Sequence, residues 1–171
     1  VVSANELRLP AGARTELVLN AHRVIHSFWV PALGGKTDMF PGRETRMTLA
    51  PTDPGVYRGQ CAEFCGASHA LMAFETVVMP PDEFDQWLSA EARDAKPPQG
   101  ALAQAGATLF LEEGCGACHT IRGTKAIGKT GPDLTHLANR HSLAAGTLPL
   151  NAQTIATWIG QCVAYANHFP V

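Results

Sequence analysis

The sequence is poor in charge, in aromatic residues and in long apolar runs. Charged residues make up 16% of its 171 residues and hydrophobic residues 46%, which excludes an intrinsically disordered chain. The formal net charge is -2, which excludes nucleic-acid binding driven by bulk positive charge. Aromatic residues account for only 7%, so a platform that stacks single-stranded bases is disfavoured as well. We expect no nucleic-acid partner.

Apolar stretches long enough to cross a membrane are also missing. Every apolar run is far shorter than the roughly eighteen residues that a transmembrane helix needs, so we expect no membrane span within this chain. The N-terminus has no basic region followed by an apolar leader and a cleavage site. Because the chain begins at Val1 rather than at Met, we expect a mature form or a fragment.

Cysteine and histidine, by contrast, are plentiful, with five and seven residues. An odd number of cysteines leaves one thiol unpaired in any purely disulfide framework. Thiolate and imidazole groups are also the common ligands of transition metals in proteins. These side chains are therefore the first candidates for a functional site.

The composition divides the chain into two small domains joined by an acidic segment. Residues 1–80 contain short β-type segments separated by Pro and Gly, at 16–19, 46–49 and 75–78, a pattern typical of a β-sandwich. Residues 81–100 carry five acidic against two basic residues, and they predict a helix over 83–91 with Asp82 as its N-cap, followed by a linker. Helical patterns at 101–113 and from 154 to 159 predict a small all-α domain over 101–171.

A first group of metal ligands lies within twelve residues of the β-type region. Two thiols, one imidazole and one thioether follow each other at Cys61, Cys65, His69 and Met72. This soft donor set selects copper over hard cations such as magnesium or calcium. One Cys with His and Met would suffice for a single copper, whereas a second thiolate can bridge two metals. A binuclear site then needs a second imidazole, for which His26 is the best candidate.

Other interpretations of the same residues are open. Cys61 and Cys65 could form a local disulfide in an oxidising compartment. Zinc would also accept cysteine and histidine, but it has little use for the Met72 thioether. His26, taken alone, could be a core histidine whose ring is satisfied by hydrogen bonds.

The ligand run resembles the binuclear copper centre, CuA, of cytochrome c oxidase subunit II. The resemblance extends to residues 26–38, 41–43 and 54–57 and covers about residues 4–90, and it implies a cupredoxin β-sandwich. In this family the domain begins with an aromatic-rich strand carrying a Trp that receives electrons, and the sequence lacks that strand. Arg23 stands where family members carry an acidic residue, which argues against the usual acidic docking face for cytochrome c.

The resemblance also implies a role for each candidate ligand. The implied copper ligands are one imidazole for each copper (His26 and His69), two bridging thiolates (Cys61 and Cys65), a weak outer thioether (Met72) and a backbone carbonyl (Glu63). The Glu63 carboxylate is further implied to face a magnesium site shared with subunit I. Such a centre needs no open coordination position, so we expect it to pass electrons and to do no bond chemistry.

A second motif, Cys115-Gly-Ala-Cys118-His119, is the C-x-x-C-H signature of covalent haem attachment. A zinc or redox C-x-x-C site is the alternative. The motif follows a predicted helix and precedes a Gly-Pro-Asp segment, and over about residues 101–159 the sequence resembles class I cytochromes c. The resemblance implies thioether bonds from Cys115 and Cys118, an iron ligand at His119, and a carbonyl at Pro132 that accepts the ring N–H of this histidine.

The sixth iron ligand is where the sequence departs from class I cytochromes c. These proteins end in a loop whose Met binds iron, but no Met follows Met79 here, and Phe169 stands at the expected place. Three interpretations are open: His168 binds the iron, the sixth position is open to water or small gases, or the ligand lies outside this chain. Of these we favour His168.

Together the two resemblances predict the electron-transfer subunit of a cytochrome c oxidase. Electrons would enter at haem c from a soluble or membrane-bound cytochrome, pass to CuA and continue to subunit I, where dioxygen is reduced; no catalytic residue is expected in this chain. Both cofactors imply the periplasmic, outer face of a bacterial inner membrane. The alternatives are an electron-entry module of a nitric oxide or nitrous oxide reductase, and a gas-binding haem sensor. Glu63 argues for the oxidase, because nitrous oxide reductases typically have Trp there.

Overall fold

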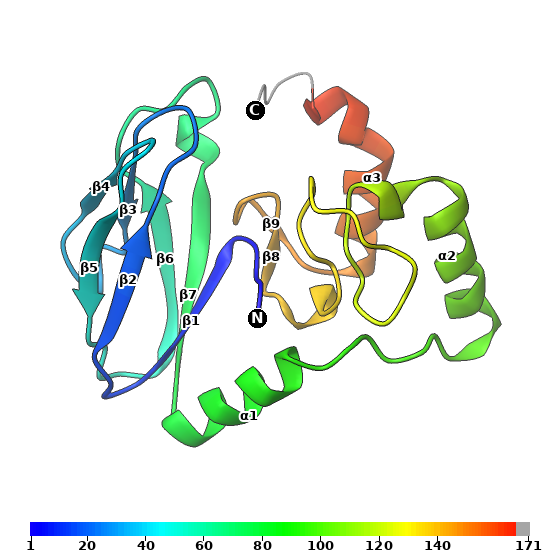
Figure 1. Ribbon diagram of the computed structural model, residues 1–171, viewed down its shortest axis with the longest axis horizontal. Helices are drawn as coiled ribbons and strands as arrows, with labels where there is room; N and C mark the ends of the chain where they lie inside the picture. The colour runs from blue at the N-terminus through cyan, green and yellow to red at the C-terminus, as the bar shows by residue number, and fades with distance from the viewer. Residues whose placement is uncertain (167–171) are drawn as a thin grey trace. The chain divides into compact units, whose positions relative to one another are not determined.

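The computed structural model describes the backbone of residues 1–166 and the side chains of residues 1–161. The described chain forms two compact units (Figure 1). The first, called here the sheet unit, contains Asn5–Phe84 and the chain from His141 onward. The second, called the helical unit, contains Val1–Ala4 and Asp85–Arg140. Each unit is described by itself below.

Two sheets, in which most strand pairs are antiparallel, face each other in the sheet unit (Figure 1). The larger sheet has the strand order β1-β7-β6-β3-β4, with bounds β1 Glu6–Pro10, β3 His26–Trp29, β4 Thr37–Met39, β6 Gly55–Cys61 and β7 Ala73–Met79. The smaller sheet pairs β2 (Thr15–Leu19) with β5 (Thr45–Leu49). In these two sheets β1 runs parallel to β7, and all the other strand pairs are antiparallel. The predicted β-sandwich and its three predicted strands are confirmed.

Alternating side chains explain why these segments become strands. In β2 and β5 the residues alternate between half-buried and exposed positions and end on a buried leucine, at Leu19 and Leu49. Each strand has one charged side chain at an outward position, and Arg46 of β5 donates to Glu16 of β2 at 2.8 Å. Such period-two patterning turns one face of a strand to the core and the other to water.

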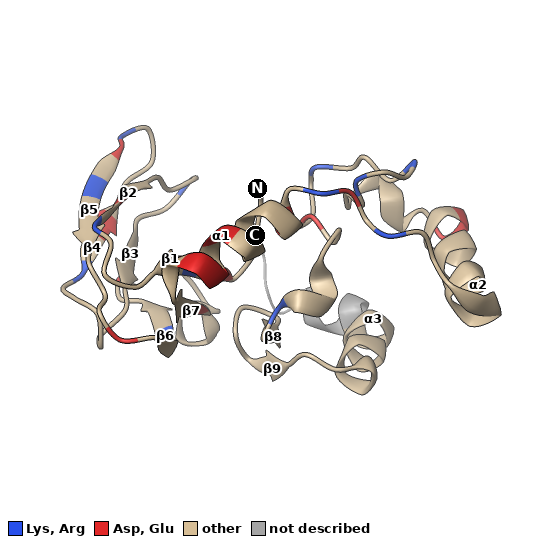
Figure 2. Ribbon diagram, turned by 90° about the horizontal axis from the view of Figure 1, so that it is seen from below, with Lys and Arg blue, Asp and Glu red and all other residues tan. Residues whose placement is uncertain are grey.

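The helices agree with the predicted ones apart from their ends. Their bounds are α1 Pro81–Glu91, α2 Gly100–Glu112 and α3 Ala152–Ala166, with 3-10 turns η1 His69–Leu71, η2 Cys115–Ala117 and η3 Leu137–Asn139. The prediction of Asp82 as an N-cap is wrong: the helix begins one residue earlier, at Pro81, because proline suits the first helical position. Asp82 and Glu83 lie in the first turn of α1 instead (Figure 2).

A small hairpin interrupts the predicted all-α region. It joins β8 (Ser142–Leu143) to β9 (Leu148–Pro149) and belongs to the sheet unit. Its strands are only two residues long, so no periodic pattern could predict them. None of the helices within residues 1–166 is long and apolar enough to cross a membrane.

In the helical unit, Arg122 binds the chain that follows α1. Its guanidinium donates to the backbone carbonyls of Glu91 and Arg93, the second at 2.9 Å. The Arg122 carbonyl in turn accepts from the Ala95 amide at 3.0 Å, and the His136 ring bonds the Arg93 carbonyl at 2.9 Å. The first residues of the predicted linker are therefore tied to the segment that follows the C-x-x-C-H motif.

Candidate metal and haem sites

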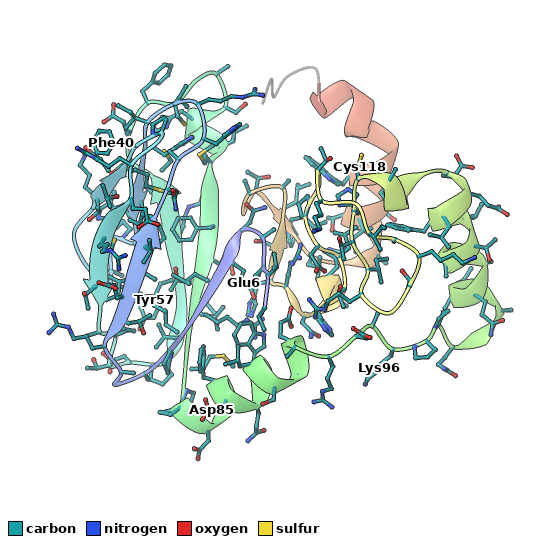
Figure 3. The ribbon with its side chains drawn as sticks, viewed as in Figure 1. Glu6, Phe40, Tyr57, Asp85, Lys96 and Cys118 are labelled. Carbon is teal, nitrogen blue, oxygen red and sulfur yellow. The ribbon has the colours of Figure 1, made fainter. Side chains whose placement is uncertain are left out.

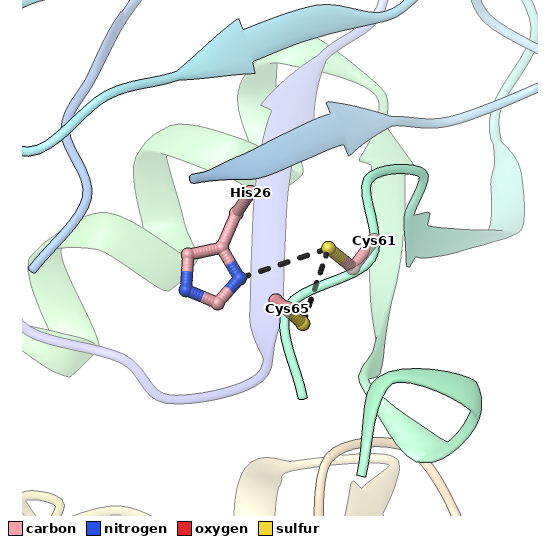
Figure 4. Close-up of side chains that lie close together, drawn as sticks. All are labelled: His26, Cys61 and Cys65. Atoms are coloured by element: carbon pink, nitrogen blue, oxygen red, sulfur yellow. Dashed lines mark hydrogen bonds between the residues drawn. The ribbon is translucent and has the colours of Figure 1, made fainter. Parts of the chain in front are cut away.

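The first candidate site lies where two neighbouring strands of the larger sheet end. His26 is the first residue of β3, and Cys61 is the last residue of β6. These strands are antiparallel partners, with Phe28 opposite Cys61. Antiparallel pairing therefore brings the start of one strand beside the end of the other, although 34 residues separate His26 from Cys61. Cys65 follows in the loop after β6 (Figure 4).

The two cysteine sulfurs lie at the centre of this cluster, with one imidazole beside each. Cys61 Sγ is 3.8 Å from Cys65 Sγ and 3.7 Å from His26 Nδ1 (Figure 4). Cys65 Sγ is 3.5 Å from His69 Nδ1 and 3.8 Å from Met72 Sδ. The structure thus brings together all five side chains predicted to bind copper. Three of them, His26, Cys61 and Cys65, have ligand atoms within 4.8 Å of one another.

Backbone groups complete the surroundings of Cys61. The Glu63 carbonyl oxygen lies 3.2 Å from Cys61 Sγ, so it faces the cluster as the resemblance implies. The Cys61 amide donates to the Met72 carbonyl at 3.0 Å, which ties the end of β6 to the last candidate ligand. The loop between them is folded back on itself by η1, where the His69 amide donates to the Gly66 carbonyl.

Both thiols are free in the structure. The sulfur separation of 3.8 Å is far longer than the roughly 2.05 Å of a disulfide bond. Burial raises the pKa of the Cys65 thiol to about 11, and both the hydrogen bond and the charge of Cys61 add to this increase. A metal ion that binds the Cys65 sulfur would displace its proton, so binding there would be coupled to proton release.

The cluster lies near the surface of the sheet unit. Met72 is 38% exposed and Phe64 is 75% exposed. The Phe64 ring leans against the His69 ring, with the ring centroids 5.7 Å apart. Apolar side chains that surround metal ligands limit the access of water and lower the local dielectric constant.

The second candidate site is the C-x-x-C-H motif of the helical unit. Cys115 begins the 3-10 turn η2 directly after α2, and Gly114 between them has φ +75°, a left-handed conformation that favours glycine. The Cys115 carbonyl accepts from the His119 amide at 3.0 Å, which places both cysteines and the histidine on one compact turn. Cys118 is exposed (Figure 3).

The His119 ring is held in one orientation by the segment that follows. Its Nδ1 bonds the Pro132 carbonyl at 2.8 Å, as the resemblance implies. Two glycines allow this close approach: a Cβ at Gly131 would lie 2.4 Å from the His119 ring, and one at Gly128 would lie 2.3 Å from the Ala117 carbonyl oxygen. Gly131 begins the Gly-Pro-Asp segment that is visible in the sequence, but only the folded chain shows that it lies against the His119 ring. Nothing in the sequence indicates the role of Gly128.

Asp133 continues the support of this segment. Burial raises the pKa of Asp133, but hydrogen bonds from Thr135 and the positive charges of Arg122 and Arg140 outweigh burial and lower the pKa overall. The carboxylate bonds the Thr135 amide at 2.8 Å and pairs with Arg122 at 3.3 Å. A charged Asp133 therefore fixes the loop next to Pro132.

The candidate sixth ligand, His168, lies outside the described residues. Arg122 binds the backbone carbonyls of Glu91 and Arg93, and the Ala145 carbonyl accepts from the Ala73 amide. Neither contact could be predicted from the sequence. Their contacts join residues far apart in the chain, and a single sequence carries no record of such pairs.

Comparison with known proteins matches each part of the chain to a family. Residues 2–79 match the family described as cytochrome c oxidase subunit II, periplasmic domain, and residues 103–163 match cytochrome c. Cytochrome c oxidase subunit 2 of Alkalihalophilus pseudofirmus is 39% identical over 157 residues, which is 92% of this chain and 45% of that protein. The subunit of Bacillus subtilis is 31% identical over 168 residues, which is 93% of this chain and 47% of that protein.

The chain thus spans about half the length of the curated relatives that it matches. Among solved structures, the periplasmic domain of subunit II of cytochrome oxidase of Bradyrhizobium japonicum is similar, at 33% identity. That similarity covers 51% of this chain and 63% of the other, with a TM-score of 0.49.

Proposed function

Because this chain joins a cupredoxin domain of the cytochrome c oxidase subunit II family to a cytochrome c domain, we propose that it transfers electrons within a haem-copper oxidase. Electrons enter at a covalently bound haem c, pass to a binuclear CuA centre and continue to the subunit that reduces dioxygen. The proposed domains are residues 1–80 for copper and 101–171 for haem, with residues 81–100 between them. The second proposed domain includes the β8–β9 hairpin, which packs in the sheet unit. The chain is an electron-transfer subunit and holds no catalytic residue.

The observation that carries this proposal is the pairing of two sulfurs with two imidazoles. The donor set is soft, as copper requires, and both sulfurs lie at the centre, where each can contact two metals. His26 and His69 would each bind one copper, with Met72 and the Glu63 carbonyl as outer ligands. A bound binuclear copper centre supplies one-electron chemistry without an open coordination position. The chain's residues hold the ligands apart at fixed distances, which keeps reorganisation on reduction small.

The helical unit has the features needed to hold haem c. Cys115 and Cys118 are free thiols on one turn, and these would form the thioether bonds. The His119 ring is oriented through Nδ1 by the Pro132 carbonyl, which leaves Nε2 for iron. Gly131 keeps the space beside this ring clear of a side chain. His168 is the proposed sixth ligand.

The proposed partners follow from the family. Subunit I and the other subunits of the complex would accept electrons, and a soluble or membrane-bound cytochrome would donate them. The Glu63 carboxylate would contribute to a magnesium site at the boundary with subunit I. The chain would work on the periplasmic face of a bacterial inner membrane, where haem c is attached and copper is loaded.

Metal content and spectroscopy of the full chain test this proposal. We expect two coppers that share one unpaired electron, together with one covalent haem. Cys65→Ser should abolish the binuclear signal and leave the haem in place. Cys162→Ser is the matched control, since Cys162 lies outside both motifs, and this variant should keep both signals. One copper per chain, or zinc in its place, would overturn the copper assignment.

Rapid mixing with a reductant tests the order of transfer. A tethered donor acts at an effective concentration of about the millimolar range, so the haem should pass its electron to copper at a rate independent of protein concentration. A rate that rises with protein concentration would contradict transfer within one chain. Rapid binding of carbon monoxide to the reduced haem would instead favour the gas-binding alternative.

A further inference from the structure

The β8–β9 hairpin touches the loop that carries the candidate copper ligands. The two segments belong to the same compact unit (Figure 1). The Ala145 carbonyl, in the turn of the hairpin, accepts from the Ala73 amide at 3.1 Å. Ala73 is the first residue of β7 and follows Met72 directly. Residues 103–163 match the cytochrome c family, so a segment of the cytochrome c region lies against the copper-binding region.

This contact involves a peptide group that is already bound on its other side. The carbonyl of the Met72–Ala73 peptide accepts from the Cys61 amide at 3.0 Å, and its N–H donates to the Ala145 carbonyl. One peptide plane is therefore held between the end of β6 and the hairpin. A planar peptide fixed at both its oxygen and its nitrogen has little freedom to rotate, so the backbone of Met72 is held in place.

Further contacts fix the hairpin to β1 and β7. The His141 amide donates to a Glu6 carboxylate oxygen at 2.8 Å, and its ring lies 3.9 Å from the Glu75 carboxylate. The Glu6 carboxylate also pairs with Arg8 at 2.6 Å. Because β1 starts only at Glu6, the β7 edge next to Ala73 has no strand beside it, and Ala145 takes that place.

The turn of the hairpin has a strained backbone conformation where it meets β7. Ala144, Ala145 and Gly146 have φ values of +50°, +55° and +76° in succession. Alanine is strained in the left-handed region by roughly 1–2 kcal/mol per residue. A Cβ at Gly146 would lie 3.4 Å from Ala73 and from the Phe74 amide nitrogen, so the turn packs directly on the β7 backbone. Strain of this kind persists where the surrounding structure determines it.

We propose that the β8–β9 hairpin is a positioning element of the copper centre, because it holds the peptide group between Met72 and Ala73 opposite Cys61. This inference rests on the proposed copper site and adds a residue pair, Ala145 and Ala73, that neither family motif contains. It makes the ligand loop dependent on a segment that lies after the haem motif in the sequence.

Two variants of the full chain remove the contact from opposite sides. Ala73→Pro deletes the single N–H that reaches Ala145, and Met72 already has φ -82° and ψ 88°, outside the helical region that a following proline disfavours. Gly146→Val strains the turn of the hairpin and leaves the sequence of the loop from Cys61 to Met72 unchanged. Gly12→Val is the matched control: Gly12 has φ +75° and nothing within 4 Å of its added Cβ, and it follows β1 near Met79, at the other end of β7.

Three measurements decide the inference. In the metal-free wild type the Ala73 amide should exchange slowly with solvent, and Gly146→Val should remove this protection. In the copper-loaded protein, Ala73→Pro and Gly146→Val should both shift the copper absorption and paramagnetic spectra. Both variants should also release copper to a chelator about ten times faster than the wild type, as expected for residues that orient metal ligands. Gly12→Val should match the wild type in spectrum and release rate.

The outcomes separate this inference from the proposed function. A wild-type chain that binds no copper overturns the proposed function. A normal copper spectrum and release rate in both Ala73→Pro and Gly146→Val overturn this inference alone, as does an Ala73 amide that exchanges freely in the wild type. If Ala73→Pro fails to fold, as judged by circular dichroism, Gly146→Val carries the decision.

Discussion

The His119 ring donates a hydrogen bond from Nδ1 to the Pro132 carbonyl at 2.8 Å. Because a carbonyl oxygen can only accept, Nδ1 carries the ring hydrogen, and Nε2 keeps the lone pair that a metal would bind. One backbone oxygen thus determines both the tautomer and the orientation of the candidate iron ligand. The neighbouring residues that place this oxygen become as important as the histidine itself.

The first prediction concerns Gly131. Gly131→Ala would put a Cβ 2.4 Å from the His119 ring, so the ring must move and its bond to Pro132 must break. We expect an altered haem absorption spectrum and a lower haem reduction potential or haem content. Gly106→Ala is the control, because nothing lies within 4 Å of its added Cβ and alanine favours a helix. Unchanged spectra in Gly131→Ala would contradict the role given to this ring contact.

The second prediction concerns Asp133 and acid stability. Its pKa in the folded chain lies below its ordinary value of 3.8, so the folded state favours the charged carboxylate. The stabilisation is fully present above the unfolded-state pKa and disappears as the pH falls through the lower folded-state pKa. Asp133→Asn should therefore be less stable than the wild type at neutral pH, and the two should converge in strong acid.

Denaturant unfolding at a series of pH values measures this difference directly. Glu112→Gln is the control, because Glu112 is exposed at the end of α2. A constant gap between wild type and Asp133→Asn down to the lowest pH would refute the assigned charge interaction.

The third prediction concerns the core beside the copper ligands. A Cβ at Gly59 would lie 2.2 Å from the Phe74 ring, and this ring packs on Phe28 with centroids 4.9 Å apart. Gly59→Ala should destabilise the chain by about 1–3 kcal/mol, which is typical of an overpacked core. Gly35→Ala has nothing within 4 Å and should have little effect. Thermal unfolding of the metal-free chain would show an equal midpoint for both variants if this packing argument were wrong.

The fourth prediction concerns the left-handed turn at Ala144 and Ala145. Glycine at either position would relieve roughly 1–2 kcal/mol of backbone strain and lose about 0.4–1 kcal/mol through the greater freedom of the unfolded chain. Relief is the larger effect, so Ala144→Gly should raise stability by up to about 1 kcal/mol. The same exchange at Ala101 in α2 should lower stability, because glycine is a poor helix former. If Ala144→Gly lowered the stability as the exchange at Ala101 does, the left-handed conformation of Ala144 would be contradicted.

Local sequence patterns predicted the strands well, and they also placed most of the candidate copper ligands close together. Alternating residues marked β2 and β5, and four of the copper-ligand side chains lie within one short segment, so their proximity needed no knowledge of the fold. His26 was different, since it approaches Cys61 only because β3 and β6 pair. It was identified through a family resemblance and not through its own spacing.

Contacts between distant segments could not be predicted in the same way. The sequence around Ala145 does not indicate that its carbonyl accepts from the Ala73 amide. The sequence around Arg122 does not indicate that its guanidinium binds the backbone that follows α1. In both contacts the accepting group is a backbone carbonyl, which every residue carries, so the amino-acid type of the partner leaves no signature. The left-handed conformation of the two alanines could not be predicted either, because glycine is the residue expected at such positions.

The parallel pairing of β1 with β7 has a consequence for biosynthesis. Glu6 lies opposite Glu75 and Pro10 opposite Met79, so the larger sheet cannot close until the whole stretch from β1 to β7 has been synthesised. Contacts between such distant residues form slowly, whereas the turn from Cys115 to His119 needs only neighbours along the chain. Cys115 and Cys118 can therefore reach their places by local folding, whereas the surroundings of Cys61 and Cys65 form only after a whole sheet has assembled.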